Sequence, residues 1–128
     1  MTTALEKIEQ TAEVLKAMEK YVDAAAQDYV RFAESTVKSY GEGLRGTVEQ
    51  QVEDFRKTLE FQVGKKWIKV IRKDGQTMVH GFVCIEPLKG FKVGDLAKPA
   101  SWHQPAKNFS RGNVLTGDVS RVRWTGVL

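Results

Sequence analysis

Cysteine, histidine and proline are scarce in this sequence, with one, two and three residues among 128. The single cysteine, Cys84, excludes an internal disulfide, and its apolar neighbours favour a buried hydrophobic role over a nucleophilic one. The two histidines, His80 and His103, lie far apart and have no partner residues at the spacing of metal ligands. We therefore expect no metal site and no disulfide-stabilised fold.

Long apolar runs and catalytic motifs are also missing. No stretch of 18 apolar residues and no charged-then-apolar leader is present, so we expect no membrane partner and place the protein in the cytoplasm. There is no Gly-rich phosphate loop ending in Lys-Ser or Lys-Thr and no Gly-x-Ser-x-Gly. Asp95 and Asp118 lie in turn contexts that explain them locally, so they form no convincing catalytic pair. We expect no catalytic residue, no cofactor and no enzymatic activity.

Charge is divided unevenly along the chain. Residues 1–63 hold 8 Lys/Arg against 12 Asp/Glu, a net charge of −4, whereas residues 64–128 hold 12 against 4, a net charge of +8, and the two sum to the +4 of the whole chain. A basic half attracts anions such as phosphates, nucleic acid or an acidic protein surface. We expect the second half to carry the binding function.

The first part of the chain predicts one long helix from residue 3 to about residue 40. Thr3 and Glu6 have the spacing of a capping box, in which each side chain bonds to the other's backbone amide. Apolar or small residues then recur in steps of three and four, a spacing typical of a coiled-coil seam: Leu5, Ile8, Ala12, Leu15, Val22, Ala26, Tyr29, Ala33 and Thr36. A second set of residues widens this stripe: Val14, Met18, Tyr21, Ala25 and Phe32.

A second helix is expected from about Thr47, after a glycine-rich turn at residues 39–46. Its apolar face comprises Leu44, Val48, Val52, Phe55 and Leu59. The helix should fold back on the first as a hairpin or pair with another subunit. Because the small second half leaves much of the first helix uncovered, we expect residues 1–63 to be a helical oligomerisation region, with a homo-oligomer formed through residues 3–63. A helical pair that only completes a monomeric core is the alternative.

From Gly64 onward the apolar period becomes that of a strand. Residues 67–72 and 77–86 are β-branched and aromatic runs, and Asp74-Gly75 between them is typical of a hairpin turn. A third strand is expected within residues 91–98. A last hairpin is expected around Gly117-Asp118, between residues 113–116 and 119–128. Residues 64–128 are thus predicted to form a basic, mostly antiparallel β-sheet domain of four or five strands, and the fold class to be α+β with a long N-terminal helical hairpin or coiled coil.

Basic residues cluster around the first predicted strand: Lys65, Lys66, Lys69, Arg72 and Lys73. They favour a solvated sheet face with a charged, protected edge. A phosphate-binding face is the alternative.

The segment 94–113 is the candidate binding loop, because it is rich in polar and rigid residues and has no regular apolar period. Trp102 is expected to plug the open end of the sheet, with a stacking surface for a ligand as the alternative. Arg121 and Arg123 alternate with apolar residues and should project to one side of the last strand, where guanidinium groups can hold phosphates. The candidate ligand-binding residues are Lys98, Trp102, His103, Lys107, Asn108, Arg111, Asn113, Arg121 and Arg123.

The loop resembles a segment of small accessory proteins from tailed bacteriophages. The resemblance spans roughly residues 78–115 and is carried by Phe82-Val83, Gly94-Asp95, Lys98-Pro-Ala-Ser-Trp102, Pro105-Ala-Lys107 and Arg111-Gly-Asn113. The stretch 88–93 is additional to that pattern. The family resembled has no assigned activity, so no catalytic residue is implied. The resemblance implies a phage protein in the host cytoplasm. Its layout is similar to that of counter-defence sponges, in which helices assemble an oligomer and a small sheet supplies nucleotide pockets.

Together these observations predict a non-enzymatic phage protein that binds an anionic, phosphate-bearing small ligand, for example a cyclic nucleotide immune signal that it would sequester. A DNA- or RNA-binding accessory protein is one alternative, since the basic half also suits nucleic acid. A virion or scaffold assembly component is the other.

Overall fold

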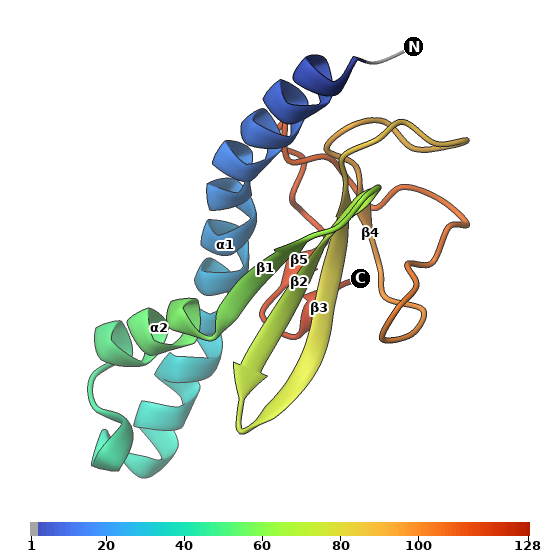
Figure 1. Cartoon of the computed structure of the whole chain (residues 1–128). Coiled ribbons are helices and arrows are strands. Elements are labelled where there is room, and N and C mark those ends of the chain that lie inside the picture. The colour runs from blue at the N-terminus through green and yellow to red at the C-terminus, as the bar shows by residue number, and fades with distance from the viewer. Residues whose placement is uncertain (1–2) are drawn as a thin grey trace.

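A long helix, α1 (Ala4–Tyr40), runs along the whole molecule in the computed structural model, which describes residues 3–128 (Figure 1). Its start is capped by Thr3, whose hydroxyl accepts a hydrogen bond from the Glu6 amide at 3.1 Å. Its end is set by Gly41, whose φ of 74° is easily reached only without a side chain. The predicted first helix is confirmed.

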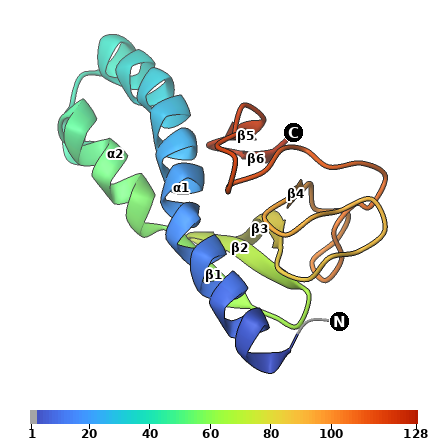
Figure 2. The same ribbon diagram turned by 90° about the horizontal axis from the view of Figure 1, so that it is seen from above.

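The second helix, α2 (Val48–Lys57), folds back on the C-terminal half of α1 after a single 3₁₀ turn, Gly43–Arg45 (Figure 2). The rings of Tyr29 and Phe55 stack with their centroids 4.6 Å apart. Arg56 forms an ion pair of 2.7 Å with Asp23. These contacts form the helical hairpin that the apolar pattern predicted as one of two options.

The sheet has four antiparallel strands in the order β1-β2-β3-β4. They are β1 (Leu59–Val63), β2 (Trp67–Asp74), β3 (Gln76–Cys84) and β4 (Leu96–Ala97). Gly75 joins β2 to β3 with a φ of 74°, which confirms the predicted turn. The strand β1 was missed, because its residues were assigned to the helical half. They form a strand because every second side chain in this segment is apolar and backbone pairing with β2 is available.

The predicted last hairpin around Gly117-Asp118 is reduced to one antiparallel bridge, between Asn113 and Asp118, and the strands expected on either side of it are absent. Instead, the side-chain oxygen of Asn113 accepts hydrogen bonds from the Leu115 and Thr116 amides, at 2.7 and 3.2 Å. This local bonding winds the chain into a turn where a strand was expected. The final hairpin comes later and is small, with β5 (Val122–Arg123) pairing with β6 (Gly126–Val127).

The main core lies between α1 and one face of the sheet. It joins the helix positions Val14, Met18, Tyr21 and Ala25 to the sheet residues Ile68, Val70 and Val83. These helix positions are the set that was predicted only to widen the seam. The predicted seam itself is divided: Ala26 and Ala33 are buried, whereas Leu5 and Ile8 are 64% and 66% exposed. Within the described chain the helices form a hairpin and no coiled coil.

His80 is buried in the centre of this core. The β2–β3 register passes from Val70↔Gly81 to Ile71↔Val79, so His80 is the extra residue of a β-bulge. Its Nε2 lies 3.1 Å from the Trp124 carbonyl oxygen, which can only accept, so we assign the ring proton to Nε2. Nδ1 then accepts from the Tyr21 hydroxyl at 2.6 Å. Burial lowers the pKa of His80 to about 4, which keeps the ring neutral at pH 7.

The opposite face of the sheet carries a smaller apolar cluster built on Phe82, Cys84, Phe91 and Ala97. Cys84 has no exposed surface, and its thiol donates to the Glu86 carbonyl oxygen at 2.9 Å. Burial raises the pKa of this thiol. The prediction of a buried hydrophobic cysteine is confirmed.

Two further observations hold for residues 3–128. None of the helices there is both long and apolar enough to cross a membrane. That part of the chain also gathers no group of three or more His, Cys, Asp and Glu side chains able to hold a metal ion.

Candidate anion-binding site

The loop 94–113 is attached to the sheet along its length. The Gly94 amide donates to the Cys84 carbonyl at 2.7 Å, and the Arg111 amide donates to the Leu96 carbonyl at 2.8 Å. Further out, the Ala106 amide donates to the Lys98 carbonyl at 2.7 Å. The loop therefore has a defined backbone that can hold side chains in fixed positions.

Asn113 is part of this attachment. Its side-chain amide donates to the Asp95 carboxylate at 2.8 Å and to the Val93 carbonyl at 3.1 Å. Its oxygen accepts from Leu115 and Thr116. Because these bonds occupy both ends of the amide, Asn113 is a structural residue, and its prediction as a ligand-binding residue is not supported by the geometry.

His103, from the tip of the loop, faces the β1–β2 hairpin across a cleft of about 310 Å³. The cleft is lined by Gln62, Val63, Gly64, Lys65, Lys66, Trp67, Lys69, Phe82 and His103. Three of these residues are lysines, and none is Asp or Glu. We call this site the lysine cleft. Three like charges without a carboxylate in the lining produce a local positive potential, which attracts anions.

Trp102 lies beside the lysine cleft, with the Lys69 ammonium 4.6 Å from the centre of a ring of its indole. This cation–π contact restrains Lys69 at the cleft. The side chain is 42% exposed and belongs to neither core cluster, so the expectation that it plugs the sheet is wrong. The tryptophan that packs against the smaller apolar cluster is Trp67, which lies edge-on to Phe82 and Phe91.

A second group of predicted residues surrounds the exposed ring of Phe109. The guanidinium carbons of Arg111 and Arg121 lie 3.8 and 5.5 Å from the ring centre. Asn108 accepts a hydrogen bond of 3.2 Å from Arg111. Neither these residues nor Lys98 and Lys107, which are exposed on the same loop, line the lysine cleft. The predicted ligand-binding residues therefore do not form a single site.

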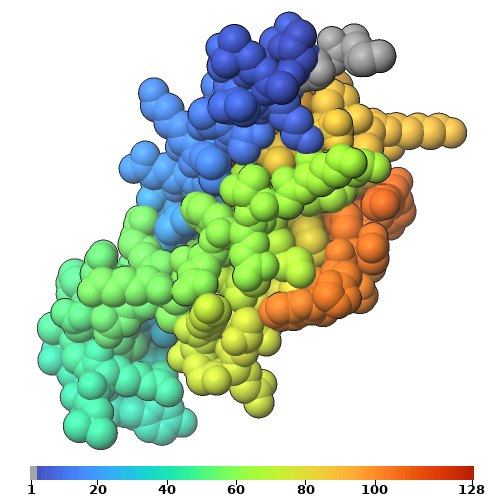
Figure 3. Space-filling view, viewed as in Figure 1, coloured from blue at the N-terminus to red at the C-terminus, as the bar shows by residue number. Residues whose placement is uncertain are grey.

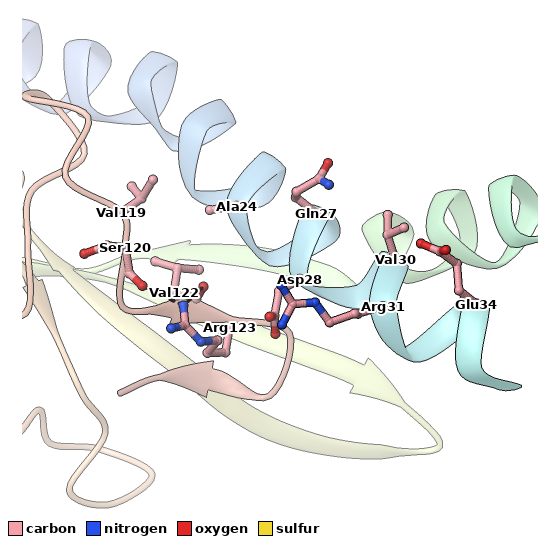
Figure 4. A pocket seen from close by; sticks show the side chains of 10 residues that line it. All are labelled: Ala24, Gln27, Asp28, Val30, Arg31, Glu34, Val119, Ser120, Val122 and Arg123. Atoms are coloured by element: carbon pink, nitrogen blue, oxygen red, sulfur yellow. Dashed lines mark hydrogen bonds between the residues drawn. The ribbon is translucent and has the colours of Figure 1, made fainter.

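Arg123 lies in a third place, on β5, where it lines a cleft shared with α1 (Figure 4). It donates to the Ser120 and Val122 carbonyls at 2.6 and 3.3 Å, and it lines a cleft of about 320 Å³ together with acidic and basic side chains of α1. The predicted shared surface of Arg121 and Arg123 is wrong, because β5 begins only at Val122 and Arg121 precedes it in a turn. The acidic residues in this cleft make it a poorer anion site than the lysine cleft.

Of the basic cluster around the first predicted strand, Lys65, Lys66 and Lys69 form the candidate site. The two-residue period places Arg72 on the α1 face with Ile68 and Val70, where its guanidinium lies between Phe55 and Trp124, 5.1 and 5.2 Å from the ring centres. Lys73 pairs with Glu60 at 3.0 Å. These lysines were not among the predicted ligand-binding residues, because a solvated sheet face was the favoured interpretation of the cluster and nothing in the sequence places it opposite His103.

Comparison with known proteins identifies the family to which the chain is similar. A family model described as Family of unknown function (DUF7717) matches residues 1–127, which span both the helical and the sheet regions. Searches of curated proteins and of solved structures found no match to the chain.

Proposed function

The chain belongs to the Family of unknown function (DUF7717), and we propose that it is a non-enzymatic binding protein for a small phosphate-bearing ligand, held in the lysine cleft. The observation that carries this proposal is that three lysines line the cleft without an acidic residue. Each ammonium offers three donors to phosphate oxygens. The His103 imidazole, on the opposite wall, adds a polar group that can bond to the same ligand.

The size and surroundings of the cleft support a nucleotide-like ligand. A volume of about 310 Å³ is at the lower end of the range for small-molecule sites, which is roughly 300–1,000 Å³. Trp102 is exposed next to Lys69, and its free surface can stack on a base. The resemblance to phage accessory proteins adds the proposal that the ligand is a cyclic nucleotide immune signal, sequestered in the host cytoplasm.

Replacing a single lysine of the lysine cleft should weaken the binding of the ligand. We expect Lys66→Ala to raise the Kd by a factor of roughly 10 to 100, because a hydrogen bond to a charged group contributes about 1.5–3 kcal/mol. Titration calorimetry against inorganic phosphate, mononucleotides and cyclic nucleotides would measure this effect. Lys89→Ala is the matched control, since Lys89 is exposed and lies outside the lysine cleft. Equal losses in both variants, or no binding to any of these compounds, would refute the proposal.

Nucleic acid is a second candidate ligand, favoured by the Arg111 and Arg121 pair outside the cleft and by the +8 charge of residues 64–128. Binding spread over many phosphates weakens steeply with salt, with a logarithmic slope of about −0.9 per phosphate on duplex DNA. A mononucleotide in the lysine cleft should show a slope several-fold shallower. Fluorescence anisotropy at three salt concentrations, with duplex DNA and with a labelled nucleotide, distinguishes the two functions.

A further inference from the structure

The uncovered part of the predicted seam lies on the N-terminal half of α1. In the C-terminal half, Ala26 and Ala33 are buried and Tyr29 stacks on α2. The same stripe continues toward the N-terminus as Leu5, Ile8, Ala12 and Leu15, and all four are exposed. The short α2 covers only the C-terminal end of the stripe, so an apolar surface remains along the rest of it.

The strand β1 is exposed beside the N-terminal half of α1. It forms one edge of the sheet, and it carries Phe61 and Val63 at 36% and 53% exposure. Its sequence, Leu-Glu-Phe-Gln-Val, contains none of the lysines or prolines that usually block an edge from pairing. In both ribbon views β1 lies next to the N-terminal half of α1, and in the space-filling view their atoms adjoin on one face (Figures 1 to 3).

The direction of the backbone groups of β1 follows from its pairing with β2. The Gly64 amide donates to the Trp67 carbonyl, and the Lys73 amide donates to the Thr58 carbonyl. Since hydrogen-bonded residues alternate along an antiparallel strand, Glu60 and Gln62 also turn their backbone groups toward β2. The N–H and C=O groups of every other residue, Leu59, Phe61 and Val63, therefore point to the free edge.

We propose that β1 pairs with β1 of a second copy of this chain, antiparallel and with the two-fold axis at Phe61, so that two sheets become one. In this register Phe61 lies opposite Phe61 of the second copy, and Leu59 lies opposite its Val63. All the outward-pointing residues are then paired with each other, and each such pair exchanges two backbone hydrogen bonds.

The side chains of β1 complement themselves in this register. Glu60, the one charged residue of the strand, comes to lie opposite Gln62 of the second copy, whose amide can donate to the carboxylate. A register centred on Glu60 would instead place two carboxylates directly opposite each other. A register centred on Gln62 would leave Leu59 without a partner in β1. The pairing centred on Phe61 is therefore the favoured one.

The pairing also explains the exposed stripe of α1. Phe61 and Val63 pair with Val70 and Ile68 of β2, whose side chains lie in the core under α1, so they face the same side of the sheet. A two-fold axis at Phe61 brings both copies of α1 to this one face. The two stripes of Leu5, Ile8, Ala12 and Leu15 then cover each other and the paired Phe61 rings, which removes apolar surface from water.

The mass of the particle in solution tests the proposal. Analytical ultracentrifugation of the full chain should give twice the chain mass of 14.4 kDa. Phe61→Lys should reduce it to that of one chain, because two ammonium groups would oppose each other at the axis. Leu44→Lys is the matched control, since Leu44 is fully exposed at the turn of the helical hairpin. A wild-type monomer, a dimeric Phe61→Lys variant or a monomeric Leu44→Lys variant would each overturn the proposal.

Amide hydrogen exchange separates strand pairing from association through α1 alone. The Phe61 and Val63 amides should be protected in the dimer and should lose that protection on dilution, whereas the Gln62 amide, bonded to β2, should stay protected. A dimer with unprotected Phe61 and Val63 amides would reject β1 as the interface. Lys66→Ala should remain dimeric, so failure of the proposed ligand site would leave this test unaffected.

Discussion

Lowering the pH from 7 to 4 is expected to reduce the free energy of unfolding by roughly 3 kcal/mol through His80 alone. The folded chain holds the pKa of His80 at about 4, below the ordinary value of 6.5, mainly because burial disfavours the imidazolium. In the window between these values the unfolded state binds the proton and the folded state does not. Stability therefore increases with pH across this window and is constant above it, as far as this group is concerned.

The contacts of His80 explain why the folded chain cannot simply accept the proton. Nδ1 is held by the Tyr21 hydroxyl at 2.6 Å, and burial raises the pKa of Tyr21, so that this hydroxyl remains a donor. A proton on Nδ1 would force the Tyr21 oxygen to accept this bond, so that the hydroxyl would lose its own buried acceptor. It would also place a charge in the core, with Arg72 adding repulsion.

Urea unfolding followed by circular dichroism at pH 7, 6, 5 and 4.5 measures this dependence. His80→Gln, which lacks the titrating group, should lose stability at pH 7 and show a flatter profile between pH 6.5 and 5. His103→Gln is the control, because His103 is exposed and should leave the profile unchanged. A wild-type profile that is already flat in that window would show that protonation of His80 does not lower the free energy of unfolding.

Gly112→Ala is expected to lower the free energy of unfolding by about 3 kcal/mol or more. Gly112 has a φ of 134°, and a Cβ there would lie 2.3 Å from the backbone oxygen of Asp118. Strain at such a φ costs about 1–3 kcal/mol, and overpacking adds a similar amount. Because the obstacle is backbone, relief requires movement of the turn that Asn113 and Asp118 form.

The comparison with Gly117→Ala isolates the steric part of this effect. Gly117 also has a positive φ, 84°, but a Cβ there meets nothing within 4 Å. Its substitution should cost only about 1 kcal/mol, from the backbone conformation. Thermal and urea unfolding of both variants would measure the difference. Equal losses of stability in the two variants would mean that residues 112–118 can rearrange to accommodate the added methyl group.

The elements of this fold that depend on local signals could be predicted from the sequence. Thr3 marks the start of α1 and Gly41 its end, because a hydroxyl cap and a glycine act within one turn of the helix. The turn at Gly75 is equally local. The strand β1 was missed, because its alternating pattern is only five residues long and directly follows a helical one.

The candidate site could be predicted from the sequence only in part. The loop 94–113 was predicted to be the binding segment, but its donors are distributed among several places. His103 faces the lysine cleft, Arg111 lies on Phe109, and Asn113 holds the loop itself. A loop without a regular period provides no rule for the direction of its side chains. Their grouping depends on contacts between distant residues, such as those of Asn113 with Val93 and Asp95, which are 20 and 18 positions away.

What the sequence by itself determined is the long capped helix, the hairpin at Gly75, the basic second half and the buried Cys84, because each depends on residue type and near neighbours. Only the tertiary structure decided which face of α1 packs on the sheet, which lysines meet His103, and that β1 is an exposed edge. These outcomes depend on how a 37-residue helix crosses a small sheet that cannot cover its whole length. The register of long-range packing is set by the sum of many contacts, and no single segment of the sequence encodes it.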